Sequence, residues 1–388
     1  MSEYIEHDRD SVSIGLAEKK SFTFGHPPGE MRLDCGSRLG PVTLAYETYG
    51  TLNGDKSNAV LVAHALTGDA HAAGYHDDAD PKPGWWDNMI GPGKGIDTDR
   101  YFVICINVIG SCMGSTGPGA TNPSTSEPYG LTFPVVTIGD MVMAQKILLD
   151  HLGIPKLLAV VGGSVGGMQV LEWCLRFPER VKAAIPLATT MRHSALAIAF
   201  NEVARQAIMA DPDWRGGSYY GSTRPDHGLA VARMIGHVTY LSDESMRKKF
   251  GRRLQDKNDF SFNFEADFQV ESYLRHQGRK FVERFDANSF LYITKAADYY
   301  DPARLYGKGS VVRALSRARA KFLVVSFTSD WLYPTYQSRD MVKAMKKNGL
   351  DVSFCEIEAE WGHDAFLISN PRLSALIRGF LERAHEEP

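Results

Sequence analysis

The sequence has no apolar run that approaches the roughly 18 residues a helix needs to cross a bilayer. Its first 20 residues mix acidic and basic side chains and lack the apolar segment of a signal peptide. Charge is nearly balanced, with 43 Lys and Arg against 46 Asp and Glu, so there is no electrostatic reason to bind nucleic acid or an anionic membrane. We expect a globular protein of the cytoplasm that has neither partner.

Cysteine is scarce and shows no pairing pattern. The chain has five, an odd number without a C-x-x-C pair, at Cys35, Cys105, Cys112, Cys174 and Cys355. This pattern argues against a disulfide framework and against a cysteine zinc site, and it fits a reducing compartment.

From residue 42 onward, short β-rich runs alternate with longer helical ones. Runs such as 59–63 and 157–161 are apolar at every position, as expected for parallel strands buried on both faces. The alternation predicts an α/β fold with a mostly parallel central sheet. The expected strands cover residues 42–48, 59–64, 101–106, 158–162, 183–187, 321–327 and 352–356.

The alternation stops between about residues 191 and 320. Residues 194–210 are expected to be helical, and more helix is expected after the Gly-rich stretch 211–228, in a segment dense in charge and, from 260 to 300, in aromatics. A helical insertion followed by two final strands indicates a lid on the core, although a separate helical domain is the alternative. The expected division is a first part of the core at 1–191, a helical lid at 192–320 and a second part of the core at 321–388, with the first 20 or so residues frayed.

The strongest local motif is G-x-S-x-G at Gly162 to Gly166, between an expected strand and an expected helix. A nucleophile at the top of a sheet needs a sharp turn, and glycines leave the space that flanking side chains would fill. The start of the helix points backbone N–H groups at a developing oxyanion. Ser164 is therefore the expected nucleophile of an α/β-hydrolase-fold enzyme that forms a covalent acyl intermediate.

A serine nucleophile needs an imidazole base that a carboxylate orients, and on this fold the chain order is Ser, acid, His. His363 follows the last expected strand in a loop with a glycine, whereas His385 sits in the charged C-terminal tail. Asp330 directly follows the preceding strand, so we prefer it as the acid to Asp340 and Asp351. The alternative for Asp330 is a cap of the turn after it.

The second oxyanion donor is expected in the loop from His64 to Gly68, where the backbone N–H of Leu66 would join that of Val165. A metal site is the other interpretation of this region, because histidines and aspartates follow. Their spacing matches no known set of metal ligands, so no metal is expected at His64, His71, His76, Asp77 and Asp78.

Eight motifs occur in a fixed order between about residues 39 and 381. They are H-A-L-T-G (64–68), A-G-Y-H (73–76), P-G-W-W-D-x-x-I-G-P-G (83–93), G-S-T-G-P (114–118), F-P-V-V-T-I-x-D-M-V (133–142), G-G-S-V-G-G-M-Q (162–169), S-D-W-L-Y-P (329–334) and G-H-D-A-F-L (362–367). In this series the sequence resembles the homoserine O-acetyltransferase family of the α/β-hydrolase type. A generic lipase or esterase would share only the G-x-S-x-G turn and the loop that carries the catalytic histidine.

The resemblance implies transfer of an acetyl group from acetyl-CoA to the hydroxyl of L-homoserine, an entry step to methionine. It implies a ping-pong mechanism, no resident cofactor, and a homodimer built through the lid helices. By position in the family's motifs, Arg233 and Tyr240 would hold homoserine and Asp364 would take its amino group. One guanidinium and one carboxylate suit an amino acid. The alternatives are a surface arginine at Arg233 and a helix cap at Asp364.

The residue after Trp331 bears on the acyl donor. Family members that use succinyl-CoA typically have an Arg there, whereas this chain has Leu332. Leucine gives a succinyl carboxylate no partner and imposes a desolvation penalty of roughly several kcal/mol, so acetyl is expected. The stretch Gly114 to Thr116 departs from the G-T-T-G-P of many acetyl users. A homoserine O-succinyltransferase, a serine O-acetyltransferase and an esterase of the same fold remain as alternatives.

Overall fold

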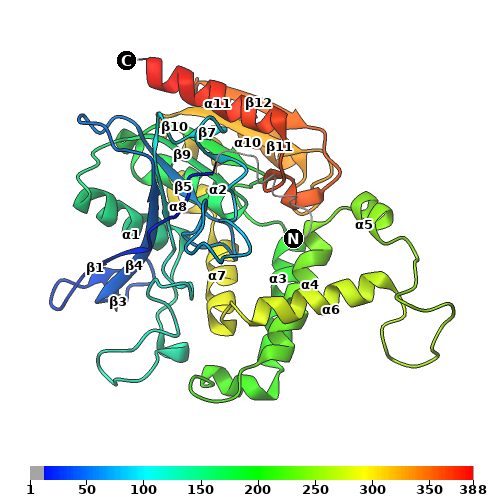
Figure 1. Cartoon of the computed structure of the whole chain (residues 1–388). Coiled ribbons are helices and arrows are strands. Elements are labelled where there is room, and N and C mark those ends of the chain that lie inside the picture. Colours follow the sequence, from blue (N-terminus) through cyan, green and yellow to red (C-terminus); the bar gives the residue numbers. More distant parts are fainter. Residues whose placement is uncertain (1–12, 388) are drawn as a thin grey trace.

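The computed structural model describes residues 13–387, and its centre is an eight-stranded sheet (Figure 1). The β1–β4 and β4–β8 pairs are antiparallel and the other neighbours are parallel. The predicted α/β-hydrolase fold with a mostly parallel sheet is confirmed. In spatial order the strands are β1 (Lys20–Phe24), β4 (Val42–Tyr49), β8 (Phe102–Ile106), β5 (Ala59–Ala63), β9 (Leu157–Gly163), β10 (Val181–Leu187), β11 (Lys321–Phe327) and β12 (Val352–Ile357).

The N-terminal edge of the sheet differs from expectation. Strand β1 was not predicted, because its alternating exposed and half-buried residues look like a polar segment. The expectation of a frayed terminus is wrong for residues 16–20, since Leu16 forms a β-bridge with Tyr75 and the Ala17 N–H donates to the Tyr75 carbonyl at 2.7 Å. Residues 1–12 lie outside the described residues. Two small ladders pair β2 (Met31–Arg32) with β3 (Arg38–Leu39) and β6 (Ile90–Gly91) with β7 (Ile96–Asp97).

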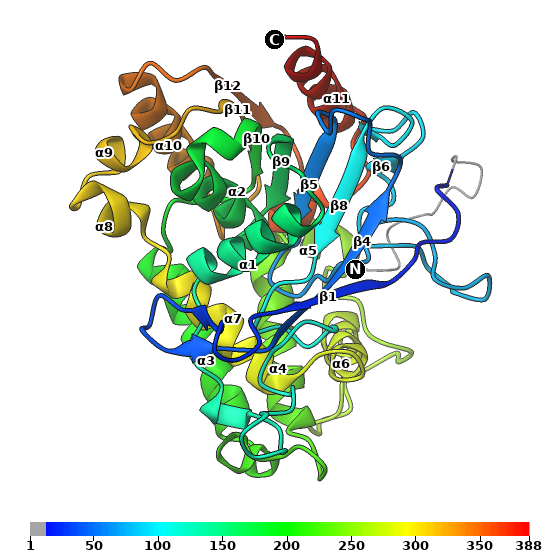
Figure 2. The same cartoon turned by 90° about the vertical axis from the view of Figure 1, so that its left-hand side faces the viewer.

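Helices cover both faces of the sheet (Figure 2). On one face, α1 (Ile138–His151), α2 (Val165–Arg176) and α10 (Thr335–Lys347) contribute to one large apolar cluster. On the other face, α11 (Pro371–Glu386) buries its apolar side in a second cluster. Because both faces are covered, the central strands are fully buried, and their all-apolar sequences follow from that burial.

Between β10 and β11 the chain forms helices and loops that extend from one end of the core (Figure 1). The later helices α8 and α9 return to the core, where α9 packs against α10, so the part that stands over the core ends with α7. In the described part of the chain no helix is long and apolar enough to span a membrane. The helices of this insertion are α3 (Ala195–Met209), η3 (Pro212–Gly217), α4 (Asp226–Tyr240), α5 (Asp243–Lys249), α6 (Gln269–Val282), α7 (Ala287–Tyr299), α8 (Pro302–Gly307) and α9 (Val311–Leu315).

The helix expected from residue 260 begins only at Gln269. Residues 260–268 belong to a loop, in which Phe262 and Phe264 are exposed. Phenylalanine recurs there at every second position, and that period of two does not match the 3.6-residue period of a helix. The aromatic content alone was therefore a misleading signal.

Candidate active site

Ser164 occupies the turn between β9 and α2, with φ +57° and ψ −124°. Few residues other than glycine adopt a positive φ. The neighbouring glycines make the turn possible, because a Cβ on Gly163 would collide with the Phe366 ring and one on Gly166 with the Ala63 carbonyl. The turn therefore projects the Ser164 hydroxyl above the end of the sheet, where the strand–turn–helix motif predicts a nucleophile.

The structure brings the three predicted triad residues together. His363 Nε2 lies 2.8 Å from Ser164 Oγ, and His363 Nδ1 lies 2.8 Å from Asp330 Oδ2. The other carboxylate oxygen, Asp330 Oδ1, accepts the backbone N–H groups of Leu332 (3.0 Å) and Tyr333 (2.8 Å). With the Nδ1 proton directed at Asp330, Nε2 is free to accept the serine proton.

Burial and charge act in opposite directions on His363. Burial disfavours the imidazolium, but the Asp330 carboxylate stabilises it by its charge and its hydrogen bond, so the pKa of His363 is raised above its usual value. The base is therefore stronger than a free imidazole, and its imidazolium is stabilised when it takes the serine proton.

Both residues predicted to supply the oxyanion donors line the pocket that contains Ser164. Val165 is the first residue of α2, so its N–H is not used by the helix, and Leu66 lines the pocket above Ser164. His64 holds this loop in place: its Nδ1 donates to the Ala65 carbonyl at 2.8 Å, and its Nε2 accepts the Val108 N–H at 3.1 Å. Burial lowers the pKa of His64, which makes it a neutral structural residue.

A pocket lies over Ser164, between the core and the lid helices α3 and α4. Arg233 reaches it from α4, with its guanidinium 4.8 Å from the centre of the Phe281 ring. Burial raises the pKa of Tyr240 to about 12 despite the nearby Arg233, so its phenol stays neutral. The predicted substrate and donor residues all line this pocket, namely Arg233, Tyr240, Leu332 and Asp364.

Asp364 is buried, and its Oδ2 has no hydrogen-bond partner among the described residues. Burial raises the pKa of its carboxyl group against the opposing effects of His363 and Arg233. A buried carboxylate without a partner is costly. The site thus offers one unsatisfied acceptor and one guanidinium, which complement a ligand that has an ammonium and a carboxylate.

Sequence reasoning missed a second hydrogen-bonded chain at the nucleophile. The Tyr333 hydroxyl lies 2.6 Å from His193 Nε2, and His193 Nδ1 lies 2.8 Å from Asp298 Oδ1. Burial raises the pKa of Tyr333 well above its usual value, and the nearby Ser164 hydroxyl acts in the opposite direction. His193 was excluded because only histidines after the acid were considered. The position of Tyr333, three residues after Asp330, was the signal that could have found the chain.

The raised pKa of His363 predicts the pH dependence of acylation. Only the neutral imidazole accepts the serine proton, so the rate of Ser164 labelling by a fluorophosphonate should fall as the pH drops, with a midpoint above 6.5. Asp330→Asn removes the stabilising charge, which should lower that midpoint and slow labelling by about 10³–10⁴-fold. Ser111→Ala, a change at a buried serine outside the triad, should keep the wild-type profile. An unchanged midpoint in Asp330→Asn would contradict this account of His363.

Comparison with known proteins identifies the family. Residues 58–369 match the family model described as alpha/beta hydrolase fold. A homoserine O-acetyltransferase of Solidesulfovibrio magneticus is 67% identical over 385 residues, which cover 99% of this chain and 97% of that protein.

Two solved structures are similar over nearly the whole chain. The crystal structure of homoserine O-acetyltransferase from Bacillus anthracis has a TM-score of 0.89 and 31% identity, covering 95% of this chain and 98% of that one. The crystal structure of esterase E22 has a TM-score of 0.86 and 32% identity, covering 94% and 100%. With this fold, these motifs and these relatives, the chain belongs to the α/β-hydrolase fold family and, within it, to the homoserine O-acetyltransferase family.

Proposed function

We propose that this protein transfers the acetyl group of acetyl-CoA to the hydroxyl of L-homoserine, giving O-acetyl-L-homoserine and CoA, as a step of methionine biosynthesis. The name of its relatives supports this activity. The observation that carries it is the contact of Ser164 with His363 and of His363 with Asp330, beneath a pocket whose wall contains Arg233 and Asp364.

The first half-reaction acylates the enzyme. His363 Nε2 takes the Ser164 proton while Oγ attacks the thioester carbonyl, and the backbone N–H groups of Leu66 and Val165 stabilise the oxyanion. The C–S bond then breaks, His363 returns the proton to the sulfur, and CoA leaves as the thiol. The acetyl group remains on Ser164, and no resident cofactor is needed.

The second half-reaction uses the same groups on homoserine. His363 takes the proton of the homoserine hydroxyl, whose oxygen attacks the acetyl-Ser164 carbonyl, and the proton returns to Ser164 Oγ as the ester leaves. Arg233 pairs with the homoserine carboxylate, assisted by Tyr240, and Asp364 accepts the ammonium. Asp364 Oδ2 lacks a hydrogen-bond donor among the described residues, and the homoserine ammonium supplies one. Homoserine binding therefore offsets the desolvation penalty of the buried Asp364 carboxylate.

A homodimer in the cytoplasm is part of this proposal. Two lid helices carry large apolar side chains that are exposed, and in the proposed dimer the partner subunit covers them. The five cysteines are all free thiols, as a reducing compartment requires. The exposed apolar side chains are Leu196, Ile198 and Val203 in α3 and Val231 and Val238 in α4.

An esterase is the second candidate, which the similarity to esterase E22 favours. An assay that measures free thiol and ester product in the same reaction distinguishes the transferase from the esterase. Each acyl donor, acetyl-CoA or succinyl-CoA, is tested with each acceptor, homoserine or serine. We expect thiol release from acetyl-CoA to require homoserine and to equal ester formation. Release that is equally fast without homoserine would indicate hydrolysis. Ser164→Ala should lower turnover by on the order of 10⁴-fold or more, whereas Ser111→Ala should retain it.

Leu332 lies in the pocket wall, where its side chain offers nothing to a second carboxylate. Leu332→Arg should raise the ratio of kcat/KM for succinyl-CoA to that for acetyl-CoA by more than about tenfold, because a charge-assisted hydrogen bond contributes roughly 1.5–3 kcal/mol. Leu332→Met, which keeps an apolar side chain of similar volume, serves as the control and should leave the ratio near the wild-type value. If the arginine variant has the wild-type ratio, Leu332 does not set donor specificity.

Asp364→Asn keeps the shape of the side chain and removes its charge. We expect kcat/KM for homoserine to fall by about 10–100-fold, because the hydrogen bond from the ammonium loses the negative charge of its acceptor. The burst of CoA that reports acetylation of Ser164 should keep its amplitude, since homoserine takes no part in that half-reaction. The assignment fails if kcat/KM for homoserine does not change, or if the burst disappears together with turnover.

A further inference from the structure

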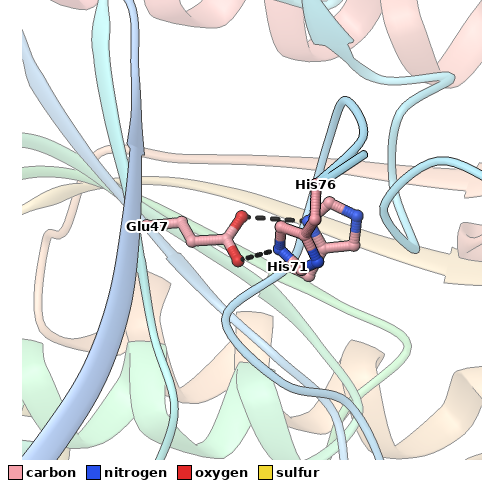
Figure 3. A group of neighbouring side chains, drawn as sticks. All are labelled: Glu47, His71 and His76. Carbon is pink, nitrogen blue, oxygen red and sulfur yellow. Dashed lines mark hydrogen bonds and ion pairs between the residues drawn. The ribbon is translucent and has the colours of Figure 1, made fainter. Parts of the chain in front are cut away.

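Glu47, from β4, lies against two histidines of the loop that follows β5 (Figure 3). His71 Nδ1 is 2.9 Å from Glu47 Oε2, and His76 Nε2 is 2.7 Å from Glu47 Oε1. One nitrogen or oxygen atom from each of the three side chains lies within 4.8 Å of the others. None of the three takes part in the proposed acyl transfer.

We propose that Glu47, His71 and His76 bind a Zn²⁺ ion that links β4 to the loop between residues 69 and 84. Two imidazoles and one carboxylate form a ligand set that zinc accepts, with water in the fourth tetrahedral position. The proposal goes beyond acyl transfer and does not depend on it. Spacing along the chain predicted no metal here, because the carboxylate comes from a strand more than 20 residues before the first histidine.

The two nitrogen–oxygen distances are close to those that zinc needs. Bonds of about 2.0–2.1 Å in a tetrahedron place ligand atoms roughly 3.3 Å apart, so the two N···O contacts at 2.7 and 2.9 Å would lengthen by about 0.5 Å. The side chains of His71 and His76 are 18% and 23% exposed. They therefore have room to move, and solvent can supply the fourth ligand.

The charge around Glu47 favours a cation. Its side chain is only 3% exposed, and no Lys or Arg within residues 13–387 forms an ion pair with it. The Tyr49 hydroxyl donates to Glu47 Oε2 at 2.9 Å. Metal-binding side chains are commonly held in position by such hydrogen bonds from neighbouring residues. The loop itself adds four aspartates and one lysine between residues 69 and 82. A buried carboxylate in acidic surroundings is stabilised by a bound cation.

The two histidines are positioned by their backbone. The His71 N–H donates to Asp69 Oδ1 at 2.9 Å, and the His76 N–H donates to Asp80 Oδ2 at 2.8 Å. The His71 carbonyl accepts the Trp85 N–H at 3.1 Å. Because the backbone is held in this way, few degrees of freedom remain to be lost when an ion binds. The competing arrangement is a hydrogen-bonded cluster, in which both imidazole N–H groups donate to the Glu47 carboxylate without a metal.

Metal content of the desalted full-length protein tests the proposal. We expect about one zinc per chain by elemental analysis. A chelator should remove the zinc and lower Tm, and Zn²⁺ but not Mg²⁺ should restore it. Co²⁺ added to the stripped protein should give the visible absorption of a four- or five-coordinate ion.

Two variants separate a zinc site from a hydrogen-bonded cluster. In His71→Asn the amide replaces Nδ1–H, and in His76→Gln it replaces Nε2–H, so both can still donate to Glu47 while losing an imidazole ligand. Each should weaken zinc binding by more than about tenfold. His227→Ala, at an exposed histidine of α4, should bind zinc like the wild type.

Two results would overturn the proposal. One is a wild-type protein with less than about a tenth of a zinc per chain whose Tm does not rise when zinc is added. The other is equal zinc binding by the wild type and both variants, since the ion would then lie elsewhere. If the wild-type protein holds no zinc and His71→Asn and His76→Gln are as stable as the wild type, the three side chains form a hydrogen-bonded cluster without a metal.

Discussion

The positive φ of Ser164 arises where β9 turns directly into α2, and the other catalytic groups are placed relative to that turn. Its N–H donates to the Leu187 carbonyl at 3.0 Å, and its own carbonyl accepts the Thr189 hydroxyl at 2.7 Å. Both partners lie at or just beyond the end of β10. A strained backbone of this kind costs roughly 1–3 kcal/mol and persists only when its surroundings hold it. The packing of β10 on β9 is therefore a condition of catalysis as well as of folding.

The two carboxylates beside His363 differ in how well they are satisfied. Asp330 accepts two backbone N–H groups and the imidazole N–H, so its carboxylate is held by hydrogen bonds and orients His363. Asp364 is also buried, yet one of its oxygens lacks a donor within the described residues. Near His363, the same residue type thus occurs once as a hydrogen-bonded partner of the base and once with an unsatisfied acceptor oxygen.

The fold and the triad were predictable because local chemistry determines them. The glycines of the elbow, the all-apolar strands and the acid that follows a strand each reflect a steric or solvation requirement that acts over a few residues. The edge strand β1 was not predictable in this way, because its pairing with β4 is a long-range contact between half-exposed residues. The His193–Tyr333 contact and the approach of Glu47 to His71 have the same origin. They join segments that only the folded sheet brings together.

The similarity to an esterase as well as to acetyltransferases raises the question of what directs an acyl-enzyme to its acceptor. Water is always more abundant than an amino acid, so transfer prevails only if the acceptor hydroxyl is held in line with the acyl carbon. Such positioning gives the acceptor hydroxyl an effective concentration on the order of 10⁵ M or more, which is well above the concentration of water in the solvent. In the proposed function, Arg233 on α4 and Asp364 beside His363, which both line the pocket, hold the two charged ends of the amino acid at Ser164. On that proposal the same triad without these two residues would act as a hydrolase, because the other groups of the mechanism do not distinguish one hydroxyl from another.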